Sequence, residues 1–302
     1  DPMTFGAFLL VFGSVFLHAG WNFLSKKKIP SLAFYGLMSS TSALLWLPFF
    51  FCSGLISAGL PPVFWLIWLG SVGFEFLYIS GLAHAYRTDD ISLVYPLARA
   101  LPVIMTALIT LGFGYGRPPG MVALTGMVIL SVGCVLMPLM RWDQFRLASY
   151  RSPALKFIVT AAAGTTGYTI LDSLALKVIY RSLEHPGWLD SCAYLFLIEA
   201  GLAASLLTAT AAIPAERGEF RKLFLKSKSP VFSGLFASTA YILILFAMER
   251  VSNVSYIQAF RQMSLPLGVL AGIFLLHEKP GKPRLAGIAL VITGLAVIAL
   301  GS

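Results

Sequence analysis

Uninterrupted apolar runs of about 20 residues recur along this 302-residue chain from one end to the other, each long enough to cross a hydrocarbon core of about 30 Å. Only 12% of the residues are charged, whereas about 25% is typical of a soluble protein. Inside lipid a helix satisfies all its backbone groups within one segment, and no barrel-like alternation is present. The sequence therefore predicts an all-α integral membrane protein.

Apolar length and polar breaks place ten transmembrane helices on the chain. Trp65, Trp142 and Trp188 fall near the ends of such segments, where aromatic belts lie at membrane interfaces. The expected spans cover residues 3–24, 31–53, 62–86, 91–113, 119–140, 153–180, 189–213, 229–249, 254–276 and 283–301.

The distribution of basic residues predicts the orientation of these spans. Sixteen of the 22 lysines and arginines fall in, or next to, the connections that follow the odd-numbered spans, whereas Arg117, Lys177, Arg181 and Arg250 belong to the opposite side. Cytoplasmic loops carry the excess of basic residues. We therefore expect a multi-pass protein of the inner or plasma membrane with both termini outside the cytoplasm. The sixteen are Lys26, Lys27, Lys28, Arg87, Arg141, Arg146, Arg151, Lys156, Arg217, Arg221, Lys222, Lys226, Lys228, Lys279, Lys282 and Arg284.

The positions of the charged residues and cysteines exclude several other classes of protein. The net charge of +9 arises from short loops beside apolar runs, so we expect no nucleic-acid partner. Cys52, Cys134 and Cys192 lie in apolar segments without the spacing of a metal site, so no metal is expected. No GxxxxGK[ST] motif is present, and we expect neither a nucleotide nor another cofactor.

The two halves of the chain, residues 1–150 and 151–302, resemble each other. Arg99 aligns with Arg261 at an offset of 162, and Gly126 and Gly133 align with Gly287 and Gly294 at an offset of 161. Because each half holds five spans, the second copy enters the membrane from the opposite face. We therefore expect two inverted five-helix repeats that form one unit, a construction common in transporters, with the substrate site between the repeats.

Three segments carry a resemblance to a known family: HAGWNFLSK at 18–26, DDISLVYPLARALP at 89–102 and HEKPGKPRLAGIALVITGLAVIAL at 277–300. With them the chain resembles the ten-helix EamA-type branch of the drug/metabolite transporter superfamily over essentially its whole length. The resemblance implies export or import of amino acids, related metabolites or drugs. Many relatives are thought to keep their termini inside, whereas the charge distribution here favours the outside.

Ionisable residues deep in the spans are functional candidates, because burying a charge in lipid costs about 2.5–3.5 kcal/mol. The deep groups are His18, Glu75, Arg99, Asp172, Glu199 and Arg261. One interpretation places the arginines on a polar cavity, and the other makes them structural partners of the acids. We expect a structural role for Glu199, which has few polar neighbours along its helix.

The candidate substrate-binding residues combine these charges with polar and aromatic side chains nearby. Three deep acids against two deep arginines leave one acid free to titrate or to meet a cationic group. Candidates for binding a coupled proton or ion are Glu75, Asp172 and His18. The full substrate-binding set is Arg99, Glu75, Tyr95, His18, Asn22, Trp21, Tyr78, Arg261, Asp172 and Gln258.

These observations favour a secondary carrier of small metabolites that works by alternating access and is not an enzyme. We expect an amino acid or a related zwitterionic or anionic metabolite, because a charge-balanced molecule limits the cost of desolvation. Export of cationic drugs or of other metabolites is the alternative, and a passive channel or a membrane-embedded enzyme is more distant. The expected partners are the substrate, the lipid bilayer and a coupled ion, in a monomer or homodimer.

Overall fold

The computed structural model describes residues 3–25, 31–88, 91–144, 154–277 and 280–301, with side chains except at 19–25, 86–88, 91–96, 271, 272, 275 and 276. Among these residues, β-type pairing is limited to an isolated bridge between Met3 and Val251. The helices are α1 (Phe5–Ser25), α2 (Leu32–Cys52), η1 (Gly54–Ile56), α3 (Pro62–Thr88), α4 (Ile91–Phe113), α5 (Met121–Leu136), η2 (Trp142–Gln144), α6 (Leu155–Ser182), α7 (Trp188–Ala212), α8 (Pro214–Lys226), α9 (Ser229–Met248), α10 (Val254–Phe260), η4 (Arg261–Met263), α11 (Ser264–Leu276) and α12 (Lys282–Leu300).

Several helices are long and apolar enough to cross a membrane. In the described part of the chain, five meet both conditions: Leu32–Cys52, Pro62–Ala85, Trp188–Ala212, Ser229–Met248 and Lys282–Leu300. Phe5–His18, Leu97–Phe113 and Met121–Leu136 are shorter apolar helices. Large apolar side chains such as Leu66, Phe113 and Phe274 lie exposed on the outer faces of the bundle, as contact with lipid requires. The structure confirms an all-helical chain that has the character of a membrane protein.

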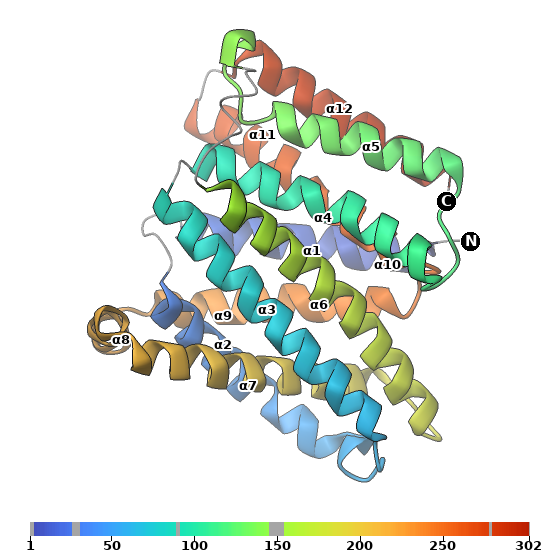
Figure 1. Ribbon diagram of the computed structural model, residues 1–302, viewed down its shortest axis with the longest axis vertical. Helices are drawn as coiled ribbons and strands as arrows, with labels where there is room; N and C mark the ends of the chain where they lie inside the picture. Colours follow the sequence, from blue (N-terminus) through green and yellow to red (C-terminus); the bar gives the residue numbers. More distant parts are fainter. Residues whose placement is uncertain (1–2, 26–30, 89–90, 145–153, 278–279, 302) are drawn as a thin grey trace.

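The helices pack in pairs that join distant parts of the sequence (Figure 1): α3 lies against α6, α2 against α7, α5 against α12 and α1 against α9. Glycines bring α5 and α12 into backbone contact. A Cβ added to Gly126 would lie 2.8 Å from the carbonyl oxygen of Gly294, and one added to Gly294 would lie 2.7 Å from that of Gly126. Small residues allow this close approach, which in lipid replaces a hydrophobic driving force.

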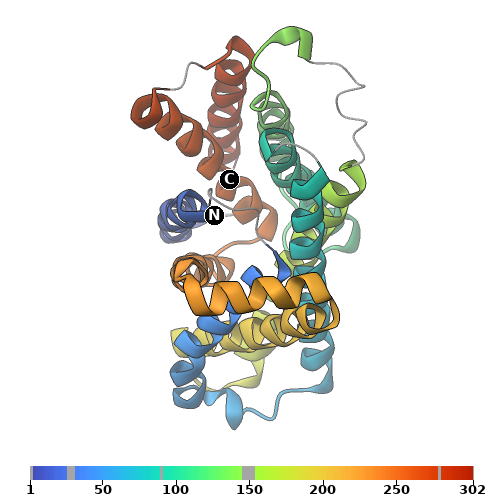
Figure 2. The same cartoon turned by 90° about the vertical axis from the view of Figure 1, so that its left-hand side faces the viewer.

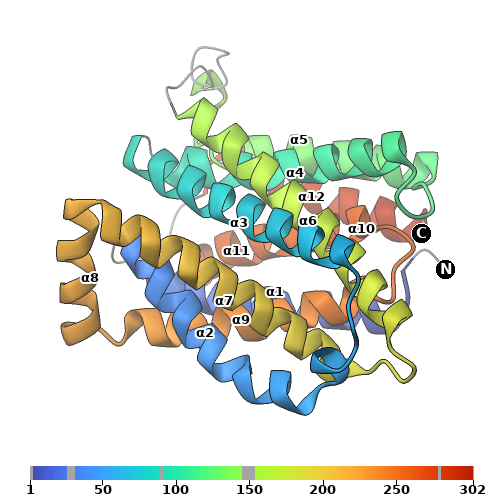
Figure 3. The same cartoon turned by 60° about the horizontal axis from the view of Figure 1, so that its bottom comes forward.

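Both termini lie at the same end of the bundle, and α8 lies at the opposite end (Figures 1 and 3). At the end with the termini, Thr4 N donates to the Arg250 carbonyl at 3.4 Å, and Arg117 N donates to the Ser252 carbonyl at 3.0 Å. The segments expected outside the cytoplasm, where few basic residues lie, thus meet at the end of the bundle that holds the termini. Figure 2 looks nearly along α1 and α9, which lie next to each other.

The structure differs from the expected helix pattern at the connection after α7. Residues 214–226, expected as a loop, form the helix α8. Its Glu216 is buried, and Oε2 accepts a hydrogen bond from Ala33 N at the start of α2 at 3.0 Å. Sequence reasoning missed this helix because its buried apolar face is short: Leu223 is buried, with Phe220 packed beside it, against α2 and α7. Four basic residues, Arg217, Arg221, Lys222 and Lys226, interrupt its apolar residues.

The expected continuous span over residues 254–276 is also interrupted. It consists of α10 and α11 joined by the 3₁₀ turn η4, which places Arg261 at the break. Pro266, just after this turn, has no N–H to donate to the Gln262 carbonyl, so the helix cannot continue regularly here. The 3₁₀ turn thus falls at the position where Arg261 is buried.

Candidate functional site

Asp172 of α6 is the point where three other helices converge. Its side chain is fully buried. Oδ1 accepts hydrogen bonds from Ser71 Oγ of α3 and, at 2.8 Å, from the hydroxyl of Tyr194 of α7. Oδ2 accepts a hydrogen bond from the hydroxyl of Tyr241 of α9. Hydroxyl donors thus contact both oxygens and fill three of the about four acceptor sites of the carboxylate, so little capacity is left for a ligand.

Arg261 lies at the helix break with part of its hydrogen-bonding capacity unused. Its side chain is 7% exposed, and Nη1 is buried without a hydrogen-bond partner in the described part of the chain. The guanidinium carbon lies 5.9 Å from the centre of the Tyr241 ring, a cation–π contact. Within the described residues no carboxylate forms an ion pair with it. A buried cation with an unused donor is suited to bind an anionic group.

Arg99 of α4 reaches the same break from the other half of the chain. Its Nη2 donates to Ser264 Oγ at 2.5 Å and to the Arg261 carbonyl at 3.4 Å. Ser264 Oγ in turn donates to the Arg261 carbonyl at 3.0 Å. His18 of α1 lies within electrostatic range of both guanidinium groups. The structure therefore brings Arg99, Arg261 and His18 together at the start of α11.

Two acids on adjacent helices provide charge of the opposite sign. Glu75 of α3 and Glu199 of α7 each have a buried Oε2 with no hydrogen-bond partner among the described residues. The charge of Arg261 acts attractively on Glu75, and the charges of Glu199 and Asp172 act repulsively on it. The interior thus holds separate cationic and anionic groups with unused hydrogen-bonding capacity.

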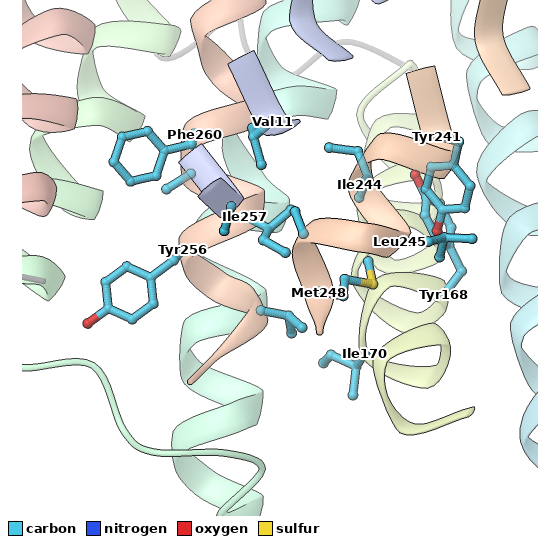
Figure 4. Close-up of a cluster of buried hydrophobic side chains, with 14 of the residues drawn as sticks. Val11, Tyr168, Ile170, Tyr241, Ile244, Leu245, Met248, Tyr256, Ile257 and Phe260 are labelled. Carbon is cyan, nitrogen blue, oxygen red and sulfur yellow. The ribbon is translucent and has the colours of Figure 1, made fainter. Parts of the chain in front are cut away.

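A row of tyrosine rings connects the helices that carry these charges. Tyr78 of α3 meets Tyr168 of α6 edge to face at 5.9 Å between ring centres, and Tyr168 meets Tyr241 of α9 at 6.0 Å. Figure 4 shows Tyr168 and Tyr241 next to each other beside Leu245. These rings form an aromatic wall between the helix of Glu75 and the break that holds Arg261.

The remaining candidates of the sequence analysis fall in different places. Gln258 of α10 is buried, and its Oε1 has no hydrogen-bond partner among the described residues, while its carbonyl accepts from Gln262 Nε2 at 2.9 Å. The side chains of Trp21, Asn22 and Tyr95 lie outside the described ones, so their roles stay predictions.

Several polar partners were not candidates in the sequence. Tyr168, Tyr194, Tyr241 and Ser264 lie on four different helices, and no motif spacing links them. The available signal was local: Tyr168 precedes Asp172 by one helical turn, and Ser264 follows Arg261 by three residues. These spacings place residues on one face but do not show which helices meet.

Comparison with known proteins supports the fold. No family model matches the sequence, and no curated protein matches it. A solved crystal structure, described only as that of a protein, is similar to this chain with a TM-score of 0.68 and 16% sequence identity, over 99% of both chains. The chain therefore shares its fold along its full length with a protein of known structure.

Proposed function

We propose that this chain is a secondary carrier that binds a small zwitterionic metabolite, most specifically a neutral amino acid, between its two halves. The observation that carries the proposal is the buried arrangement of unused groups of opposite charge. The Nη1 of Arg261 fits a substrate carboxylate, and the orphaned oxygen of Glu75 fits an ammonium group. A ligand of balanced charge satisfies both without adding net charge to the interior.

Helix pairing supports the proposal that ten spans form two inverted five-helix repeats, 1–150 and 151–302. A half-turn that exchanges the halves would convert the α3–α6 pair into the α9–α1 pair, and would map α2–α7 and α5–α12 onto themselves. The same half-turn would exchange the Gly126–Gly294 contact with the Gly133–Gly287 contact. In the latter, a Cβ added to either glycine would lie 2.8 Å from the carbonyl oxygen of the other. Transporters with inverted repeats place their substrate at the interface of the repeats.

The proposed alternating access rests on how the charged side chains of the interior are divided between the two halves. Glu75 and Arg99 belong to the first half, and Asp172, Glu199 and Arg261 belong to the second. A substrate that bridges Glu75 and Arg261 holds the two halves together, and a rocking motion about this site exposes it to either side. The resemblance of the sequence to EamA-type transporters favours this mechanism over a channel or an embedded enzyme.

Uptake by the reconstituted protein tests the proposal. Proteoliposomes loaded with a mixture of unlabelled neutral amino acids should exchange it for the tritium-labelled mixture in a saturable manner. Arg261→Gln should lower the initial rate at least tenfold, because the substrate carboxylate loses its buried cation. Arg141→Gln, which alters an exposed arginine, is the matched control and should exchange like the wild type. Absence of saturable exchange in the wild type would refute the proposal.

A carrier of organic cations is the second candidate, because two buried acids have unused oxygens. In that case tetraphenylphosphonium, rather than the amino acids, would be taken up by the wild type, and Glu75→Gln would abolish its uptake. Both probes can be measured in the same proteoliposomes.

A further inference from the structure

Glu75 of α3, which is half-buried, and Glu199 of α7, which is buried, are like-charged side chains on adjacent helices. Glu199 is 7% exposed, and each side chain has a buried Oε2 without a hydrogen-bond partner among the described residues. Negative charges on Glu199 and on Asp172 both act repulsively on Glu75. Two ionised carboxylates in such a place repel each other at low dielectric and have too few donors to offset their burial.

Side chains of α3 pack closely on the backbone of α7 next to the two acids. Trp68 Nε1 of α3 donates to the Leu197 carbonyl of α7 at 3.0 Å. A Cβ added to Gly201 of α7 would lie 2.8 Å from both Trp68 and Val72 of α3. Val72 lies within one turn of Glu75 and Trp68 lies two turns from it, while Leu197 and Gly201 lie within one turn of Glu199, so helix packing holds the two acids near each other.

The other polar groups near the pair do not neutralise it in the described structure. Asp172 of α6 is acidic itself, and its oxygens already accept three hydroxyl donors. Arg261 attracts Glu75 but forms no ion pair with it there. Ser39 of α2 lies beside Glu199, and its fully buried hydroxyl is the donor nearest to that carboxyl group, although the two do not reach the geometry of a regular hydrogen bond. One weakly engaged hydroxyl is not enough to offset two buried negative charges.

We infer that Glu75 and Glu199 bind one exchangeable proton between them and that this is the proton site of the proposed carrier. A proton from water forms an O–H bond with one carboxylate, which donates a hydrogen bond to the other, and it returns to water when the pair is exposed again. With one proton bound, the pair carries one negative charge and Asp172 carries another. These two negative charges match the two positive charges of Arg99 and Arg261. The interior is then balanced in charge.

A proton fits this place better than a metal cation does. No group of three or more His, Cys, Asp and Glu side chains that could hold a metal occurs in the described part of the chain. Hard cations such as Ca²⁺ take about six to eight oxygen ligands. Two neighbouring carboxylates whose charges repel each other instead resemble acid pairs that share one proton.

Infrared titration of the full protein in lipid nanodiscs tests this inference without any substrate. The carbonyl band of protonated carboxyl groups should titrate in two coupled steps in the wild type. Glu199→Gln and Glu75→Gln should each leave a single step, at a pH different from either wild-type step. Asp143→Asn, which removes an exposed acid, should keep both steps. The inference is wrong if either glutamine variant retains the wild-type titration, because the two acids are then independent.

Two further measurements separate the possible failures. Replacing choline chloride by sodium chloride should leave the titration unchanged; a sodium-dependent shift would assign the pair to a metal cation and overturn the inference. In proteoliposomes, accumulation of the labelled amino acids driven by a proton gradient should fall at least tenfold in Glu199→Gln and be unchanged in Asp143→Asn. A wild type without exchange would refute the carrier, whereas the infrared result would still decide the proton pair.

Discussion

Asp172 and Arg261 show that burial alone does not define the role of an ionic side chain. Asp172 accepts three hydroxyl donors from α3, α7 and α9, so its charge is offset by the protein. Arg261 is nearly as buried, yet it retains an unused donor. A buried charge whose hydrogen-bonding groups all have partners stabilises the fold. A buried charge with an unused donor either serves to bind a ligand or lowers the stability of the protein.

The network around Asp172 leads to a prediction about stability. Asp172→Ala should strand the hydroxyls of Ser71, Tyr194 and Tyr241, at about 1–3 kcal/mol for each group left unsatisfied. Asp172→Asn keeps a carbonyl oxygen as acceptor and should lose much less. Thermal unfolding in detergent, followed by circular dichroism, should order the melting temperatures as wild type, Asn variant, Ala variant. Equal melting temperatures of the two variants would contradict the structural role.

At the scale of the helices, the structure rests on a few close backbone approaches. Gly294 of α12 packs against Leu130 and Gly126 of α5, and an added Cβ would lie 2.6 Å from Leu130 N. Gly73 of α3, by contrast, has no atom within 4 Å of the added Cβ. The two glycines look alike in the sequence, but only Gly294 is required by packing.

This difference predicts opposite results for the same substitution. Gly294→Ala should destabilise the protein by about 1–3 kcal/mol, because helices α5 and α12 must separate. Gly73→Ala should be neutral or stabilising, because alanine favours a helix over glycine by about 1 kcal/mol. Chemical unfolding in mixed micelles compares the stabilities of the two variants directly. A loss of stability in Gly73→Ala would contradict the open space found around a Cβ at this position.

The contact between α8 and α2 makes a second prediction at this scale. Glu216 accepts from Ala33 N at the N-terminus of α2, where a negative charge also complements the helix dipole. Glu216→Ala should cost about 1–2 kcal/mol. Glu219→Ala is the matched control in the same helix, because Glu219 makes a long surface contact of 3.9 Å to Lys222. If both variants lower the melting temperature equally, the capping role is wrong.

For the whole molecule, the placement of the termini at one end and of α8 at the other leads to a prediction of topology. The basic residues Arg217, Arg221, Lys222 and Lys226 of α8 should face the cytoplasm, and both termini should face outside. An alkaline phosphatase fusion after Ser302 should therefore be active in cells, and one after Ser227 should be inactive. The reverse pattern would invert the orientation.

The sequence by itself determined the class of the protein and the positions of most helices. Apolar length is a local property, and lipid permits helices alone for such segments, so the expected spans and the observed helices agree within a few residues at most positions. It also identified the buried charges, because an ionisable group inside an apolar run is visible without knowledge of its neighbours.

Only the tertiary structure decided which of the buried ionisable side chains have hydrogen-bond partners. Whether Asp172 bonds to Tyr194 and Tyr241, or Glu199 lies within electrostatic range of Glu75, depends on how helices far apart in the chain pack. The same is true of α8, which is held by Glu216 and Leu223 rather than by a long apolar face. Helical spacing places residues on a face, but the partner of that face is chosen by packing over the whole molecule.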